Sequence, residues 1–148
     1  MICYMASSID GKIIVERFSK SYYPNKIGSE YHQYGEEILH GQAMMMGLTT
    51  LHKDFVKTLY EKDPNSKPAT NFEPFRGKHE TKAYTIFTDI EGTTRYDVNQ
   101  VHGNDLIAIL GETVSEEYLQ HLRDRNVSYV FAGKDGHDFH KALKQLQE

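Results

Sequence analysis

Short apolar runs alternate with amphipathic helical segments along this chain, and this alternation restricts its fold more than any other feature. Each run is bounded by turn residues, which is typical of buried strands. The predicted strands are residues 1–8, 43–46, 83–88, 106–110 and 128–132. Strands joined by helices favour an α/β fold with a central, mostly parallel sheet flanked by helices.

The helical segments carry their own start signals. Helices are expected from Ser29 to His40, after Ser115 and after Asp138, because Ser and Asp side chains cap helix N-termini. The first helix would place its apolar residues on one face, and the last helix has a stripe at i, i+3, i+4 and i+7 that suits packing on a sheet. These apolar residues are Tyr31, Tyr34 and Ile38 in the first helix, and Phe139, Ala142, Leu143 and Leu146 in the last.

Length and charge exclude several classes of protein. The 148 residues correspond to one domain, residues 1–148, and the net charge of −4 argues against nucleic-acid binding, which needs a basic patch. No run of 18 apolar residues predicts a membrane span, and no secretion signal precedes the first strand. A cytoplasmic protein without membrane partners is therefore expected, with Cys3 as a small core residue. No metal is expected, because the His137 and His140 pair has no third ligand at suitable spacing.

Two strand-to-turn junctions suggest chemistry. The first run leads into Ala6 and the turn Asp10-Gly11, where small residues allow a flat ligand to approach the backbone. The second run ends at Gly47 and is followed by two threonines, Thr49 and Thr50. Glycine and hydroxyl groups at the carboxyl end of a strand suit a bound phosphate. Together the junctions favour an enzyme that uses a nucleotide cofactor.

Three segments carry a resemblance to a known family. They are SSIDGKI after the first strand, GLTT after the second, and LRDRNVSYVFAGKDGHDFHKALKQL near the end. In this order they resemble the pyrimidine reductase family, which comprises the C-terminal reductase domain of the bifunctional riboflavin-biosynthesis deaminase/reductase and its stand-alone relatives. The resemblance covers essentially the whole chain. It implies a dihydrofolate-reductase-like fold and a homodimer.

The resemblance also implies a reaction and a set of cofactor-binding residues. The family members are NADPH-dependent oxidoreductases, and a member would reduce a pyrimidine- or pterin-like molecule by hydride transfer. The cofactor would supply the hydride, and the protein would position it. The positions that match the family's cofactor-binding residues are Ala6, Gly47, Thr50, Asp54, Thr88 and Gly133. Two of these have a second interpretation from the residues alone, Ala6 as a buried strand-end residue and Asp54 as a surface carboxylate.

Ser8, Asp10 and His40 are the candidate substrate-binding residues. The first two belong to the S-x-D-G turn of the resemblance, and Asp10 could equally bond the N–H groups of its own turn. His40 would lie near the end of the first helix, where a positive charge favours the negative pole of the helix dipole. No residue is assigned to catalysis.

The chain departs from the family in three places. Leu48 stands where the family often has an arginine after the glycine, and Tyr4 stands where the bifunctional enzymes have a lysine. No Glu-Gly-Gly stretch follows Leu146, so the fold is expected to lack the family's last strands. These departures favour an alternative function, in which a non-catalytic or truncated relative keeps the fold as a binding or assembly module.

Overall fold

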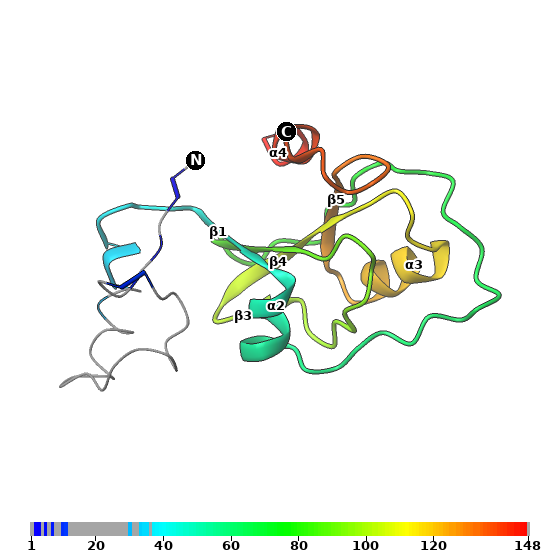
Figure 1. The fold of residues 1–148 in the computed structure, drawn as a ribbon, viewed down its shortest axis with the longest axis horizontal. Coiled ribbons are helices and arrows are strands. Elements are labelled where there is room, and N and C mark those ends of the chain that lie inside the picture. The colour runs from blue at the N-terminus through cyan, green and yellow to red at the C-terminus, as the bar shows by residue number, and fades with distance from the viewer. Residues whose placement is uncertain are drawn as a thin grey trace. The chain divides into compact units, whose positions relative to one another are not determined.

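The structure is a computed structural model, and it describes residues 2, 3, 5, 7, 10, 11, 30, 33–35 and 37–147. The chain divides into two compact units, Met1–Gly41 and Gln42–Glu148. The second unit holds the helices and strands that are labelled in Figure 1.

The second unit is built on a five-stranded sheet. Its strands are β1 (Ala43–Gly47), β2 (Tyr84–Thr88), β3 (Gln100–Val101), β4 (Asn104–Leu110) and β5 (Ser128–Phe131). The pairs β1–β2, β2–β4 and β4–β5 are parallel, and only β3 pairs antiparallel, with the first residues of β4. The mostly parallel α/β sheet expected from the sequence is therefore confirmed.

Helices follow three of the strands. They are α2 (Leu48–Thr50), the π-helical turn η2 (Leu51–Phe55), α3 (Glu116–Asp124) and α4 (Phe139–Gln145). The two predicted caps of α3 and α4 are confirmed: Ser115 accepts a hydrogen bond from the Tyr118 N–H at 3.2 Å, and Asp138 accepts one from the Lys141 N–H at 3.0 Å. Each cap satisfies an N–H group that has no partner within its own helix.

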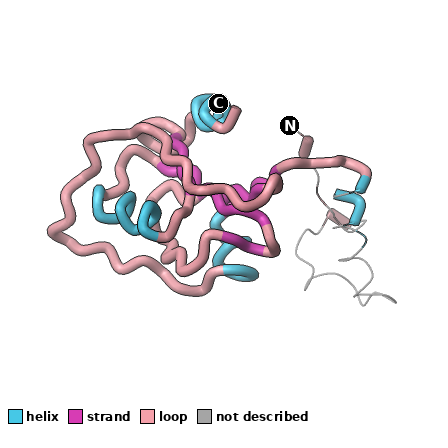
Figure 2. The backbone as a smooth tube through the Cα atoms, turned by 180° about the vertical axis from the view of Figure 1, so that it is seen from behind, coloured by secondary structure: helices cyan, strands magenta, loops and turns pink. Residues whose placement is uncertain are grey.

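The register of the parallel strands divides the core into two layers. Phe87, Ala108 and Tyr129 are paired across β2, β4 and β5, so they point to one face of the sheet, which α3 covers. The neighbouring residues Ile86 and Ile109 point to the opposite face, where Ala142 of α4 packs. The helices α3 and α4 thus lie on opposite sides of the strands, as both views of the backbone show (Figure 2).

β1 is less buried than the sequence pattern at residues 43–46 predicts. Met44 and Met45 are 40% and 36% exposed, whereas β4 and β5 are almost entirely buried. Among the described strands β1 pairs only with β2, and therefore lies at an edge of the sheet. An apolar run identifies a strand, but its burial depends on what the fold places beside it.

The first unit, Met1–Gly41, corrects two further expectations. Its described residues between Glu30 and Glu37 are helical, as predicted, although Ser29 and Tyr31 lie outside the described residues. Tyr34 and Ile38 are 48% and 59% exposed, so this helical face is not buried as expected.

The predicted first strand, residues 1–8, is wrong at the residues that the structure describes. Ile2, Cys3, Met5 and Ser7 are not in a strand, and all four are exposed, so Cys3 is not a core residue. An apolar run forms a strand only where a neighbouring strand bonds its N–H and C=O groups. The sheet that the structure describes contains none of these residues.

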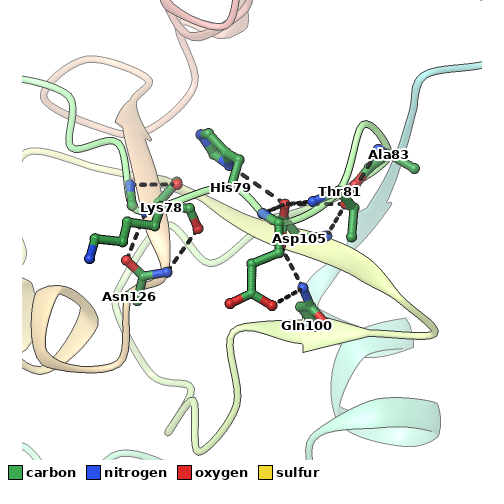
Figure 3. A network of polar contacts seen from close by, with 10 residues as sticks. Lys78, His79, Thr81, Ala83, Gln100, Asp105 and Asn126 are labelled. Carbon is green, nitrogen blue, oxygen red and sulfur yellow. Dashed lines mark hydrogen bonds and ion pairs between the residues drawn. The ribbon is translucent and has the colours of Figure 1, made fainter.

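A polar network fastens residues 77–83 across the amino ends of the strands (Figure 3). One carboxylate oxygen of Asp105 accepts hydrogen bonds from the N–H groups of Glu80 and Thr81 at 3.0 and 2.9 Å and from the Thr81 hydroxyl at 3.1 Å. The other oxygen accepts one from Gln100 at 2.9 Å. Asn126 exchanges two hydrogen bonds with the main chain of Lys78. The end of the long loop before β2 is therefore held to the sheet.

The network predicts an acid-sensitive contribution to stability. Burial opposes the ionisation of Asp105, but its hydrogen bonds outweigh that effect and lower the pKa of its carboxyl below the ordinary value of 3.8. The stabilisation is therefore complete above the unfolded-state pKa and is lost as the pH falls through the lower folded-state pKa. We expect Asp105→Asn to reduce the free energy of unfolding by about 1–3 kcal/mol at neutral pH.

Urea denaturation at several pH values measures this effect. The variant should also lose less stability than the wild type on acidification, because its side chain no longer titrates. Asp97→Asn is the control, since that exposed carboxylate pairs with the exposed Arg95, and it should change the free energy of unfolding by less than about 0.5 kcal/mol. Equal effects of the two substitutions would contradict the prediction.

Candidate functional site

The carboxyl ends of four parallel strands form one edge of the sheet, and three predicted cofactor-binding residues lie along it. Gly47 of β1 is paired in register with Thr88 of β2. Thr88 is paired with Ile109 of β4, and Gly133 follows the end of β5. From β1 to β5 there are three strand spacings, or roughly 14 Å. The topology therefore places these residues on a single edge, as an extended ligand would require.

Within the second unit, the β1 end of this edge is open. A Cβ built on Gly47 would meet no atom within 4 Å, and the side chain of Thr50 is exposed. Leu48 is half-buried and packs against the larger core layer. Asp54 lies in η2, one turn after Thr50. The groups that remain at the open end are main chain and threonine hydroxyl, which are donors suited to phosphate oxygens.

The end of β2 is occupied by a buried carboxylate. Asp89 is fully buried and accepts hydrogen bonds from the N–H and hydroxyl groups of Thr93, from the Thr94 N–H and from the Tyr118 hydroxyl. The distances of these four bonds lie between 2.7 and 3.1 Å. Asp89 therefore holds the loop after β2 and the helix α3 together, and its oxygens face protein donors. Thr88, one residue earlier, is half-buried.

The connections after β4 and β5 leave on opposite faces of the sheet, and the place where they diverge is called the switch point. The chain leaves β4 toward α3 on one face and leaves β5 toward α4 on the other, and ligands of open α/β sheets bind at such points. Here the Glu112 N–H donates to the Gly133 carbonyl at 3.0 Å, and the Glu112 carboxylate forms an ion pair with Lys141. The sequence analysis missed Glu112 and Lys141. The signal was present, because Gly111 and Glu112 follow an apolar run just as Gly47 and Leu48 do.

Two glycines close the loop after β5. Gly133 and Gly136 have φ values of 76° and 73°, and the Gly136 N–H donates to the Gly133 carbonyl at 3.1 Å. A Cβ on Gly136 would lie 2.0 Å from Cγ2 of Ile90, so only glycine fits between these loops. Gly136 is therefore a turn residue. The β4–β5 end of the edge is thus packed by main chain, in contrast to the β1 end.

The substrate-binding candidates belong to the first unit. Ser8 and the predicted cofactor-binding residue Ala6 lie outside the described residues. Asp10 is an exposed turn residue, and Gly11 beside it has the positive φ of 77° that the Asp-Gly turn predicted. His40 is exposed, with a φ of 50°. The structure therefore brings Gly47, Thr50 and Thr88 to one end of an edge and leaves the substrate-binding assignments as predictions.

Other kinds of site find little support in the part of the chain that the structure describes. There, no three His, Cys, Asp or Glu side chains gather in a way that could hold a metal ion. None of the described helices is long and apolar enough to cross a membrane. Comparisons with protein-family models, with curated proteins and with solved structures find no match. The function must therefore be argued from the geometry of the sheet edge.

The buried Asp89 predicts a large effect at Tyr118. Burial and the nearby Asp89 charge raise the pKa of Tyr118 well above its ordinary value, so its hydroxyl stays protonated and donates to the carboxylate. Tyr118→Phe removes that donor and leaves a buried charge with one bond fewer. We expect the free energy of unfolding to fall by about 1.5–3 kcal/mol, measured by urea denaturation. Tyr84→Phe, at a half-buried residue of β2, is the control and should cost less than about 0.5 kcal/mol.

Proposed function

We propose that this chain is an NADPH-dependent reductase of the pyrimidine reductase type, and that the cofactor binds along the carboxyl edge of the sheet. One observation carries the proposal: Gly47 and Thr88 are side by side in register at the open end of a parallel sheet, with the Thr50 hydroxyl exposed after them. The substrate would be a pyrimidine- or pterin-like molecule, as the resemblance implies. A homodimer is part of the same proposal.

The residues at the β1 end fit the phosphates of a dinucleotide. Gly47 presents bare main chain, so a ligand can approach more closely than any side chain would permit. Thr50 offers a hydroxyl donor one turn into the helical segment. NADPH, when bound, supplies a hydride for reduction, while the protein contributes binding and orientation. Lys141 and Glu112 would lie nearer the other end of such a ligand, at the switch point.

A non-catalytic binding module is the second candidate, and two observations favour it. Leu48 packs into the core at the position where the family often has an arginine, so no guanidinium is available there to form a bidentate contact with phosphate. The β4–β5 end of the edge is also filled by the contacts between Gly136 and Ile90. Such a module would bind NADPH weakly, or would bind NADPH without oxidising it when a pterin or a ribosylaminopyrimidine is added.

Substitution of Gly47 separates ligand binding from folding. The φ of Gly47 is −77° and a Cβ there meets open space, so Gly47→Val should leave the free energy of unfolding within about 0.5 kcal/mol of the wild type. The valine side chain would occupy the space where a ligand contacts the main chain. We expect the variant to bind NADPH more than about tenfold more weakly in isothermal titration calorimetry.

Removal of the Thr50 hydroxyl tests the second contact. A hydrogen bond to a charged group contributes about 1.5–3 kcal/mol, so Thr50→Val should weaken NADPH binding about tenfold to hundredfold. Thr70→Val removes a hydroxyl from an exposed loop residue and should leave the affinity unchanged. Absence of saturable NADPH binding by the wild type would overturn the proposal. Binding without NADPH oxidation, followed at 340 nm with dihydrofolate as the first probe, would favour the module instead.

A further inference from the structure

A hollow of about 330 Å³ lies between α3 and the segment Thr58–Glu61. Its volume is at the lower end of the range of small-molecule pockets, which is about 300–1,000 Å³. The residues that line it come from three separate parts of the chain. They are Thr58, Leu59, Tyr60, Glu61, Arg95, Glu117, His121 and Arg125.

The walls of this hollow are fixed by hydrogen bonds and by helix geometry. The Tyr60 N–H donates to the Thr93 carbonyl at 2.8 Å, and the Arg95 N–H donates to the Thr58 carbonyl at 3.1 Å. These bonds join Thr58–Glu61 to the segment that carries Arg95. On the other side, Glu117, His121 and Arg125 are spaced four residues apart, so they lie in a row on one face of α3 and its C-terminal cap.

Aromatic rings line the middle of the hollow. The His121 ring lies 5.2 Å from the Tyr60 ring, and Tyr60 in turn contacts Tyr118 edge to face at 4.8 Å. Nε2 of His121 is buried and has no hydrogen-bond partner in the part of the chain that the structure describes.

The positive charges near His121 affect its pKa more than the negative charges do. Burial is the first cause that lowers the pKa of His121 below its ordinary 6.5, followed by the positive charges of Arg125 and Arg95, while Asp97 and Asp124 oppose them with smaller effects. Arg95 pairs with Asp97 through its Nε, and this exposed pair is weak. The terminal guanidinium nitrogens of Arg95 are thus outside that contact.

Negative groups also border the hollow: Glu61 and Glu117 line it, Asp97 pairs with Arg95, and Asp124 precedes Arg125 in the sequence. Glu117 is two turns before Arg125 along α3, or about 12 Å, which exceeds the screening length of about 8 Å at physiological salt. The helix C-terminus contributes about half a negative charge, and Asp97 and Asp124 add theirs, but the effects of these two aspartates on His121 are smaller than those of Arg125 and Arg95. The end of the hollow near His121 therefore favours an anionic group.

We propose that this hollow binds the phosphate or carboxylate group of a small molecule between Arg95 and Arg125, with the rest of the molecule against the rings of Tyr60 and His121. Guanidinium groups bind both anions through paired N–H donors. The site is separate from the edge proposed for NADPH. Because α3 connects two parallel strands, it runs from the carboxyl edge back to the amino edge, where Arg125 lies three residues before β5 begins.

The test is a titration of the full chain followed by ¹H–¹⁵N NMR of the α3 amides and by the ring signals of His121. Inorganic phosphate is the probe in one arm of the experiment and succinate is the probe in the other. The probe that binds with the higher affinity identifies the anionic group, phosphate or carboxylate, of the natural ligand. We expect saturable shifts confined to α3 and Thr58–Glu61, and a rise in the His121 pKa at saturation. Arg95→Gln and Arg125→Gln should each weaken binding at least about fivefold.

Arg76→Gln is the matched control, because Arg76 is an exposed arginine outside the hollow and its loss changes the net charge equally. Unchanged binding in this variant supports the site. An equal loss in Arg76→Gln, or no saturable shift with either probe, would overturn the proposal. The variant Gly47→Val should bind phosphate normally in α3, and loss of that binding would also overturn it. The result does not depend on whether NADPH binds.

Discussion

The parallel pairing of β1, β2, β4 and β5 is the constraint on which the rest of the second unit depends. Strands that run in one direction bring all of their carboxyl ends to one edge and all of their amino ends to the other. Because paired residues point to the same face, the register also decides which side chains meet α3 and which meet α4. The open β1 end, the switch point at β4 and β5, and the direction of α3 all follow from this arrangement.

Two buried aspartates hold the loops at the two edges. Asp89 bonds the loop after β2 and the Tyr118 hydroxyl of α3. Asp105 bonds the end of the loop before β2 at the amino edge. Each carboxylate is satisfied by several protein donors, which is what a buried charge requires. Their positions at the ends of strands could be mistaken for functional sites. Their hydrogen bonds instead show that they stabilise the fold, and they leave main chain and threonine hydroxyls as the groups open to a ligand.

The sequence predicted local features well. The observed β2, β4 and β5 overlap the predicted runs at residues 83–88, 106–110 and 128–132, and the caps Ser115 and Asp138 bond as expected. It did not predict the exposure of β1, nor the absence of strand structure at the described residues of 1–8. It also missed the ion pair between Glu112 and Lys141 at the switch point. These outcomes depend on neighbours that the pattern of one segment does not reveal.

The sequence by itself determined the fold class, the helix starts and the identity of most strands, because these depend on periodicity and on residues a few positions apart. Tertiary structure alone decided that Gly47 lies beside Thr88 and that Asp89 bonds to Tyr118. It also decided that Arg95 and Tyr60 meet the face of α3 in one hollow. Each of these contacts joins residues far apart in the chain, and only the packing of strands and helices around a shared core brings such residues together.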